Sequence, residues 1–247
     1  MYFNNKSELI SKLNSLKILL SGSQGECYLD KNNKLVYKIY HQFLDNYDDV
    51  KYNYNEVMRF SNVSNNTYIF PKDIIDVNNE IVGYTMDYVS AKDLSSINPL
   101  LVKLDRLITN INNVSIDIEH ISDNGILSYD VMYNILYKTK FNVIDTDEYM
   151  YKDIDPNILF EMNKQRFDYA LYNFLVDGYF NEFVNSYRKL KNMYKDKSVD
   201  VVIFIELLRK YLSEYIGDEV SKLNDAKECM NKRKVLEPFY IRDIKIK

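Results

Sequence analysis

The apolar residues of this chain change their pattern near residue 90, and the change limits the folds that it can adopt. Residues 18–88 contain short runs rich in β-branched and aromatic side chains, which are typical of strands. After Pro99 the apolar residues recur at intervals of three and four, the spacing of amphipathic helices. We therefore expect an α+β protein with a sheet-rich region at 1–89 and a mainly helical region at 90–247.

In the first region the pattern predicts a small antiparallel sheet with one helix packed on it, at 47–60, after an N-terminal helix at 6–17. The run Asp-Lys-Asn-Asn at 30–33 and the pair Asn78-Asn79 predict tight hairpin turns. Five strands are expected, at 18–20, 26–29, 34–40, 73–77 and 81–88.

The second region has few strand-like runs and many helical ones. A long helix is expected after Pro99, and three or four more follow Pro156, one of them at 199–215. The short strand-like runs lie at 126–127, 135–137 and 142–144.

Composition excludes several classes of protein. The net charge is −4 with Lys and Arg spread along the chain, so we expect no nucleic-acid partner. No apolar run is long enough to span a bilayer, and we expect a soluble, cytoplasmic protein. Cys27, Cys229, His41 and His120 are the only cysteines and histidines, too few for a disulfide framework or a structural zinc site.

Three oxygen-bearing side chains in the second region indicate a chemistry. Asp130 and Asn134 lie in the run Asp-Val-Met-Tyr-Asn, and Asp145 closes the apolar run 141–144. An Asp, then an Asn, then an Asp at the end of a strand are typical of sites that hold a nucleophile and a magnesium–nucleotide complex, although the Asn usually follows the first Asp by five residues and here follows it by four. The pattern therefore favours phosphoryl transfer.

Two features of the first region fit a nucleotide site. Gly22-Ser23-Gln24-Gly25 lies between two expected strands, either as an ordinary hairpin turn or as a turn whose amides approach phosphate oxygens. In the strand that follows, alternation places Lys38 on one face with Val36 and Tyr40. A lysine among apolar neighbours needs a partner, and the nearest candidate downstream is Glu56; the alternative is that both are solvated.

Together these segments resemble the protein-kinase-like superfamily over about residues 19–149. Gly22 to Tyr28 resembles the second half of the glycine-rich loop, Lys38 the strand-three lysine, and Glu56 the glutamate of the single helix. Residues 86–89 resemble the gatekeeper and hinge, 128–136 the catalytic loop, and 143–145 the strand that ends in the metal-binding aspartate.

The resemblance implies a bilobal kinase fold that binds ATP and Mg²⁺. Asp130 would orient or deprotonate the acceptor hydroxyl, and Lys38, paired with Glu56, would contact the α- and β-phosphates. Asn134, Asp145 and Asp147 would hold the metal. The residues implied in nucleotide binding are Gly22, Ser23, Gln24, Gly25, Cys27, Lys38, Met86, Asp87, Val89 and Asp93, where Asp93 fits a helix N-cap equally well and Cys27 fits a packing role.

The chain departs from the family pattern at several positions, and these departures limit the type of kinase that we expect. Leu20 replaces the first loop glycine, Ser128 and Tyr129 replace the His and Arg before Asp130, and Met132 replaces the cation that neutralises the transferring phosphate. Asp147 adds a carboxylate two residues after Asp145, as in choline and aminoglycoside kinases. The segment after it is too short for a long peptide-binding activation loop.

Three functions remain open on these residues. The first is an ATP-dependent kinase that phosphorylates a hydroxyl, most simply Ser or Thr on a protein. The second is a small-molecule kinase, favoured by Asp147 and the short segment that follows it. The third is a pseudokinase that binds nucleotide and acts as an interaction module, favoured by Leu20, Met132 and the altered catalytic loop.

Overall fold

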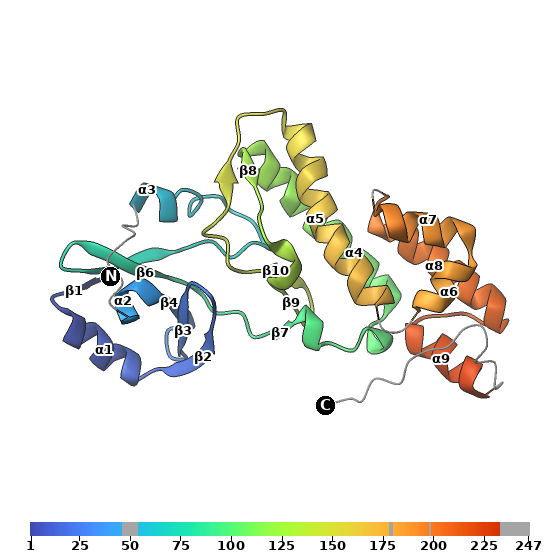
Figure 1. The fold of residues 1–247 in the computed structure, drawn as a ribbon, viewed down its shortest axis with the longest axis horizontal. Coiled ribbons are helices and arrows are strands. Elements are labelled where there is room, and N and C mark those ends of the chain that lie inside the picture. The colour runs from blue at the N-terminus through green and yellow to red at the C-terminus, as the bar shows by residue number, and fades with distance from the viewer. Residues whose placement is uncertain (46–53, 178–179, 198, 233–247) are drawn as a thin grey trace. The chain divides into compact units, whose positions relative to one another are not determined.

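The computed structural model places residues 142–149 with the first ninety residues of the chain, although the sequence pattern assigned them to the second region. It describes residues 1–45, 54–177, 180–197 and 199–232 (Figure 1). The chain forms two compact units. Unit 1 comprises Met1–Ser90 and Asn142–Tyr149, and unit 2 comprises Ala91–Phe141 and Met150–Lys247.

Unit 1 is built on a six-stranded sheet with the order β1-β5-β6-β4-β3-β2. Its strands are β1 (Tyr2–Phe3), β2 (Lys17–Ser21), β3 (Gly25–Asp30), β4 (Leu35–Tyr40), β5 (Asp73–Val77) and β6 (Glu80–Asp87). The five expected strands are thus confirmed. The sheet is mixed rather than antiparallel, because β1 pairs parallel with β5, opposite Asp76 and Val77. Two residues are too few to show alternation, so β1 gave no signal in the sequence.

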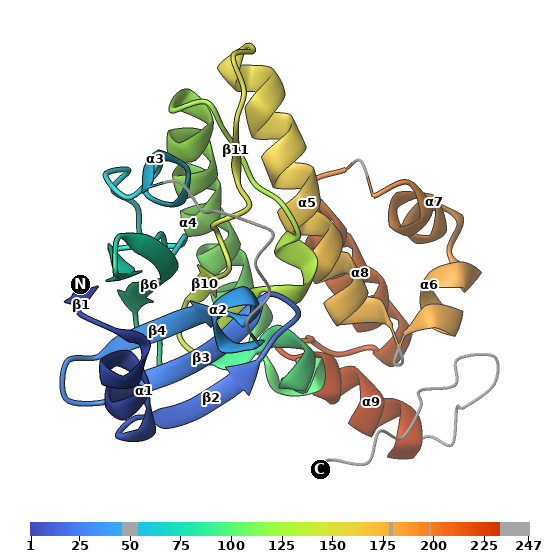
Figure 2. The same cartoon turned by 60° about the vertical axis from the view of Figure 1, so that its left-hand side comes forward.

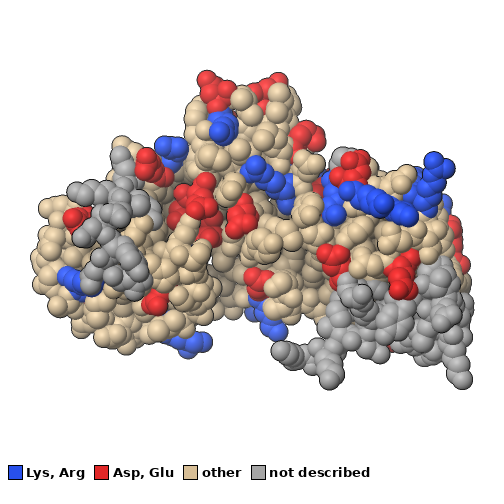
Figure 3. All heavy atoms as spheres, in the orientation of Figure 1, with Lys and Arg blue, Asp and Glu red and all other residues tan. Residues whose placement is uncertain are grey.

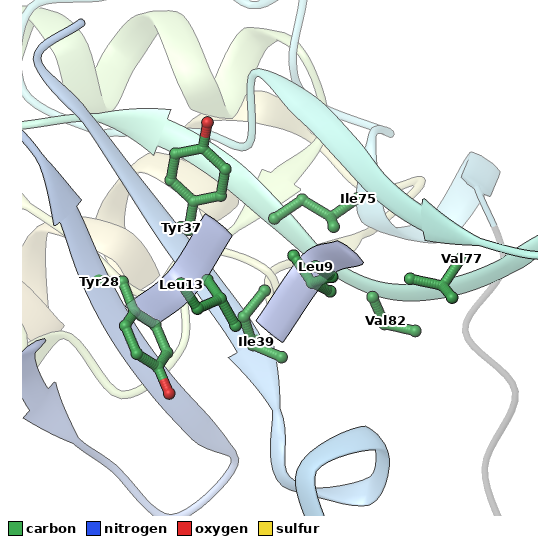
Figure 4. Close-up of a cluster of buried hydrophobic side chains, with 8 residues drawn as sticks. All are labelled: Leu9, Leu13, Tyr28, Tyr37, Ile39, Ile75, Val77 and Val82. Carbon is green, nitrogen blue, oxygen red and sulfur yellow. The ribbon is translucent and has the colours of Figure 1, made fainter. Parts of the chain in front are cut away.

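Helix α1 (Lys6–Asn14) covers one face of this sheet. It begins at Asn5, whose side chain accepts a hydrogen bond from the Glu8 amide as an N-cap. Leu9 and Leu13, one turn apart, point from α1 toward Ile39 and other apolar side chains of the sheet (Figure 4). This cluster buries one face of β4, so the alternate residues of that strand occupy the opposite face.

The two expected hairpin turns of unit 1 are present. The Asp30 carboxylate accepts hydrogen bonds from the amides of Asn32 and Asn33 at 3.1 and 3.2 Å. Asn78 and Asn79 have left-handed backbones with φ of 54° and 67°, a conformation that Asn tolerates well. Local turn chemistry therefore set both hairpins.

The remaining helices of unit 1 differ from the single one expected. Helix α2 (His41–Asp45) directly follows β4, and α3 (Tyr54–Val57) covers part of the range expected to be helical. Residues 47–53 of the expected helix lie outside the described residues.

Unit 2 is mainly helical, as expected. Its two longest helices, α4 (Leu104–Asp123) and α5 (Pro156–Val176), lie side by side in Figure 1 and Figure 2. Asp155 caps α5 by accepting from the Asn157 amide, and Pro156 opens the helix, which explains why it begins there. The helices that follow are α6 (Asn181–Ser186), α7 (Arg188–Asp196), α8 (Val201–Ile216) and α9 (Leu223–Lys232). The described residues thus contain five helices from Pro156 onward, where three or four were expected.

Short elements complete unit 2 and carry the chain back to unit 1. The strands are β7 (Lys92–Asp93), β8 (Ile126–Leu127), β9 (Ile135–Tyr137), β10 (Phe141–Val143), which enters unit 1, and β11 (Met150–Tyr151); the 3-10 turns are η1 (Leu94–Ser96), η2 (Pro99–Leu101) and η3 (Val131–Tyr133). The sequence predicted β8, β9 and β10, while the two-residue strands β7 and β11 were missed.

Two surface properties bear on the expected partners. Figure 3 shows basic side chains gathered over α7, a nine-residue helix that contains Arg188, Lys189, Lys191 and Lys195. These basic residues of α7 are a local departure from the even spread of Lys and Arg expected from the sequence.

Among the residues described, no helix combines the length and the apolar character needed to cross a membrane.

Candidate functional site

Lys38 is a buried lysine in the sheet of unit 1. It lies on β4 between Cys27 of β3 and Tyr84 of β6, and its side chain shares a face with Val36 and Tyr40, as alternation predicted. The residue is only 4% exposed. An ammonium group so far from water requires anionic partners.

Two aspartates of the segment 142–149 supply these partners. The Lys38 Nζ lies 2.5 Å from Asp145 Oδ1 and 3.0 Å from Asp147 Oδ1, and it also donates to Gln24 Oε1 at 2.9 Å. Burial lowers the pKa of Lys38, but the charges of Asp147 and Asp145 more than offset it, so the pKa lies above its usual value. With all three groups ionised, one ammonium and two carboxylates leave a net charge of −1.

Tyr84 completes this cluster and was missed in the sequence. Its hydroxyl donates to Asp147 Oδ1 at 3.1 Å, and the Lys38 ammonium lies 5.6 Å from the centre of its ring. Burial, with the neighbouring charge of Asp147, raises the pKa of Tyr84 well above its usual value. The available signal was alternation on β6, which puts Tyr84 on the same face as Met86.

The backbone of the segment 142–149 is fixed to its neighbours in unit 1. The Ile69 amide donates to the Val143 carbonyl at 2.9 Å, and the Thr146 hydroxyl donates to the Ile69 carbonyl at 2.8 Å. Between these anchors Asp145 has a left-handed backbone with φ of 61°. The anchors hold the two aspartate side chains at Lys38.

The run Gly22 to Gly25 forms the hairpin turn between β2 and β3, which both interpretations of this motif require, and the Gly22 amide donates to the Gly25 carbonyl at 2.9 Å. A Cβ on Gly25 would lie 2.2 Å from the Ile39 carbonyl oxygen, which only glycine avoids. Gln24 links the turn to the acidic segment, since its side-chain amide hydrogen-bonds both Lys38 and Glu148. Contact of Gly22 and Ser23 with phosphate remains a prediction.

The expected pair between Lys38 and Glu56 is not formed among the described residues. Glu56 lies on α3 with its side chain exposed to solvent. The Lys38 ammonium has three N–H donors, and these are taken up by Asp145, Asp147 and Gln24. Glu56 was chosen for its closeness in sequence, whereas the actual partners lie more than a hundred residues downstream.

The expected adenine-binding residues occupy two kinds of environment. Cys27 and Met86 are buried in the apolar cluster beside Lys38, and burial raises the pKa of the Cys27 thiol to about 11, so its packing role is confirmed. Asp87 closes β6 and pairs through its carboxylate with Lys72 at 2.7 Å. Val89 follows two residues later. Binding of adenine by Asp87 and Val89 stays a prediction.

In unit 2 the expected catalytic residue Asp130 and the expected metal ligand Asn134 lie on one loop. Asp130 precedes η3, has a left-handed backbone with φ of 46°, and exposes its side chain. The Asn134 side-chain amide donates to the Asp130 carbonyl at 2.9 Å, which closes the loop across η3. Four-residue spacing therefore brings these two residues together.

This loop is anchored through Ser128, at the position where the expected kinase-like pattern has histidine. Ser128 is fully buried, and its amide and hydroxyl both donate to the side-chain oxygen of Asn163 on α5 at 2.8 Å. Asn163 in turn donates to the Ser122 hydroxyl and the Ile126 carbonyl. Asn163 was missed, because nothing near it in sequence marks it as a partner of this loop.

Asp93, also in unit 2, acts as a helix cap. Its carboxylate accepts from the Ser95 amide at 2.7 Å at the start of η1, which confirms the N-cap interpretation. A role toward ribose stays a prediction, because an N-cap leaves the second carboxylate oxygen available.

The donor chemistry of the acidic segment suits a magnesium ion. Among the described residues, no group of three or more His, Cys, Asp and Glu side chains is arranged to hold a metal. Magnesium, however, commonly takes one or two carboxylates and completes its shell with water and phosphate oxygens. Asp145, whose side chain is 39% exposed, and Asp147 can provide these carboxylates. The third expected ligand, Asn134, belongs to unit 2.

The comparison with known proteins gives no family for this chain. No protein-family model matches it, and the search of curated proteins found no match either. Its function is therefore inferred from its own residues.

Proposed function

We propose that this chain is an ATP-dependent phosphotransferase with a bilobal protein-kinase-like fold, which transfers the γ-phosphate to a Ser or Thr hydroxyl of a protein. The observation that carries the proposal is the buried Lys38, held by Asp145 and Asp147 within one unit. A buried lysine and two carboxylates after a short strand are the groups that bind nucleotide phosphates and their metal in kinases.

Unit 1 is assigned to the nucleotide. Lys38 supplies a permanent positive charge for the α- and β-phosphates, because its raised pKa keeps it protonated at neutral pH. Asp145 and Asp147 leave the cluster with net negative charge, which favours a bound cation. Magnesium held there would shield the phosphate charges during transfer.

Unit 2 is assigned to the acceptor hydroxyl. The exposed carboxylate of Asp130 can accept the proton of a hydroxyl group or orient it for attack. The Asn134 side chain bonds the Asp130 backbone carbonyl rather than its carboxylate, so the carboxylate is left available to an acceptor.

Phosphorylation of a small-molecule hydroxyl is the second candidate, and one observation favours it. Strand β11 ends at Tyr151 and helix α5 begins at Pro156, which leaves only residues 152–155 between them. A regulatory kinase places its long peptide-binding segment in this part of the chain. A short connection suits an acceptor that needs no extended groove.

The test is phosphate transfer by the full chain with magnesium and γ-labelled ATP. The acceptors are the protein itself, a panel of proteins and a panel of small alcohols and amino sugars. Labelling of protein supports the first candidate and labelling of an alcohol the second. Asp145→Ala should abolish transfer in both cases, because it removes a carboxylate from the cluster around Lys38.

Asp123→Ala is the matched control, since Asp123 is an exposed carboxylate at the end of α4 in unit 2, outside the proposed site. It should transfer phosphate like the unmodified chain. Binding of ATP with no turnover on any acceptor would contradict the proposal and identify a nucleotide-binding pseudokinase.

A further inference from the structure

Arg166 on α5 contacts the loop that carries Asp130. Its guanidinium carbon lies 5.9 Å from the centre of the Tyr129 ring, within the range of a cation–π contact. Seven residues later on the same helix face, the Asn173 side chain lies 4.0 Å from the Met132 sulfur. Two α5 side chains thus contact the residues on either side of Asp130 and Val131.

The Arg166 guanidinium makes no hydrogen bond to any residue that the structure describes. Its Nη1 atom is buried and without an acceptor. The neighbouring cation on α5 is different, because Lys164 lies 2.7 Å from both Asp168 Oδ2 and Asp200 Oδ2. A buried donor without an acceptor is costly, while the Arg166 side chain as a whole is only partly buried and so can be reached by a ligand. Arg166 therefore has unused capacity to bind an anion.

The kind of anion can be inferred from the Arg166 guanidinium and from its position beside the Asp130 loop. A guanidinium presents a planar fork of N–H donors that matches phosphate and carboxylate oxygens. The Tyr129 ring restricts the plane of the fork, and the next residue in the chain is Asp130, to which the acceptor hydroxyl is assigned. An oxyanion bound at Arg166 would belong to a molecule whose hydroxyl lies near Asp130.

We propose that Arg166 binds a phosphate or carboxylate group of the acceptor, so that this chain phosphorylates the hydroxyl of an acidic molecule or acidic peptide segment. The inference rests on the proposed phosphotransferase function and names its acceptor class. Arg166 also provides a cation near the loop in which Met132 stands in place of the usual one.

The first experiment measures anion binding without phosphate transfer. The full chain is treated with phenylglyoxal, which modifies arginines, and modification of Arg166 is followed by peptide mass spectrometry. Inorganic phosphate and glycerol 3-phosphate should each slow modification of Arg166, while glycerol should not. Arg106, an exposed arginine of α4 in the same unit, is the internal control and should react at an unchanged rate.

Variants then distinguish the contribution of the Arg166 guanidinium from that of the Tyr129 ring beside it. Arg166→Gln should weaken binding of labelled inorganic phosphate in equilibrium dialysis by about tenfold or more, as expected for loss of a charge-assisted hydrogen bond. Arg106→Gln should leave it unchanged. Tyr129→Phe, which keeps the ring, should bind as the unmodified chain does, and Tyr129→Ala should bind more weakly.

Two results would overturn the inference. One is modification of Arg166 at the same rate with and without inorganic phosphate and glycerol 3-phosphate. The other is slowing by magnesium–ATP alone, which would assign Arg166 to the nucleotide. Either could occur while Asp145→Ala still abolishes transfer, so failure of this inference is distinguishable from failure of the proposed function.

Discussion

The two sets of candidate residues differ in how the protein holds them. Lys38 is buried, and it binds the Asp147 carboxylate, whose side chain is only 8% exposed, so the charge of Lys38 is balanced inside unit 1. Asp130 is exposed, and its loop is held by backbone and neutral side-chain contacts through Asn134 and Ser128. An ion pair therefore helps to hold Lys38 and Asp147 in place. The charge of Asp130 takes no part in holding its loop.

The comparison indicates which substitutions should affect the stability of the fold and which should affect only the proposed reaction. In unit 1 the groups proposed for phosphate binding also satisfy one another, so each substitution should disturb the fold. In unit 2 the carboxylate proposed for catalysis can be changed alone, because the anchoring is done by its neighbours. The predictions below test this division, from the largest expected effect to the smallest.

Asp130→Asn should reduce the turnover number for phosphate transfer by about 10²–10⁴-fold, the range for loss of a general base. It should change the unfolding free energy by less than about 0.5 kcal/mol, because the side chain is exposed. Steady-state kinetics and urea denaturation measure the two effects. A large loss of stability would show that the Asp130 carboxylate is structural.

Lys38→Met should lower the unfolding free energy by about 3 kcal/mol, because it leaves the buried carboxylate of Asp147 without its cation. Urea denaturation at neutral pH measures the loss. Lys152→Met is the matched control, since Lys152 is exposed. Glu56→Gln should also stay within about 0.5 kcal/mol, because Glu56 is exposed and does not pair with Lys38. Equal losses in Lys38→Met and Lys152→Met would refute a stabilising charge cluster.

Asn163→Ala should lower the unfolding free energy by about 2–3 kcal/mol, because it leaves the buried Ser128 amide and Ile126 carbonyl without their partner. Ser128→Ala removes a single hydroxyl and should cost about 1 kcal/mol. Thermal or urea unfolding of both variants gives the order. The reverse order would mean that Asn163 does not anchor the loop.

Alkaline pH should weaken unit 1 through Lys38 and Tyr84. The pKa of each is raised above its usual value, 10.5 and 10.0 respectively, so the stability that each contributes is complete below pH 10 and is lost as pH rises through the folded pKa. Tyr84→Phe should reduce the loss of unfolding free energy between pH 9 and 11 by about 1 kcal/mol.

Tyr2→Phe, at an exposed position, is the control for that measurement. Other buried tyrosines add losses of the same sign, so the difference between Tyr84→Phe and the unmodified chain is the quantity to compare. No difference between the two pH profiles would contradict the assigned environment of Tyr84.

Features set by local sequence could be predicted. Alternation along β4 placed Lys38 on the face of Val36 and Tyr40, and the asparagines at 78–79 marked a hairpin. The same holds for Asp130 and Asn134, whose four-residue spacing brings them together on one turn. In each case neighbours within a few residues determine the geometry.

Features set by distant contacts could not be predicted. The Lys38 partners lie at 145 and 147, and the sequence offered only their likeness to metal ligands. The pairing expected between Lys38 and Glu56 came from preferring a nearby carboxylate, and it is not formed. Likewise, Arg166 shows no special signal on α5, and only the packing of that helix on η3 brings it to Tyr129.

The return of residues 142–149 to unit 1 has a consequence for protein synthesis. When residue 90 leaves the ribosome, the sheet can form, but Lys38 has neither of its aspartates and the Ile69 amide lacks its acceptor on Val143. Unit 1 becomes complete only after about sixty further residues, including all of α4, have been made. A fragment that ends at residue 90 should therefore be less stable than unit 1 in the full chain. During synthesis, the Lys38 ammonium group should stay in water until Asp145 and Asp147 have been made.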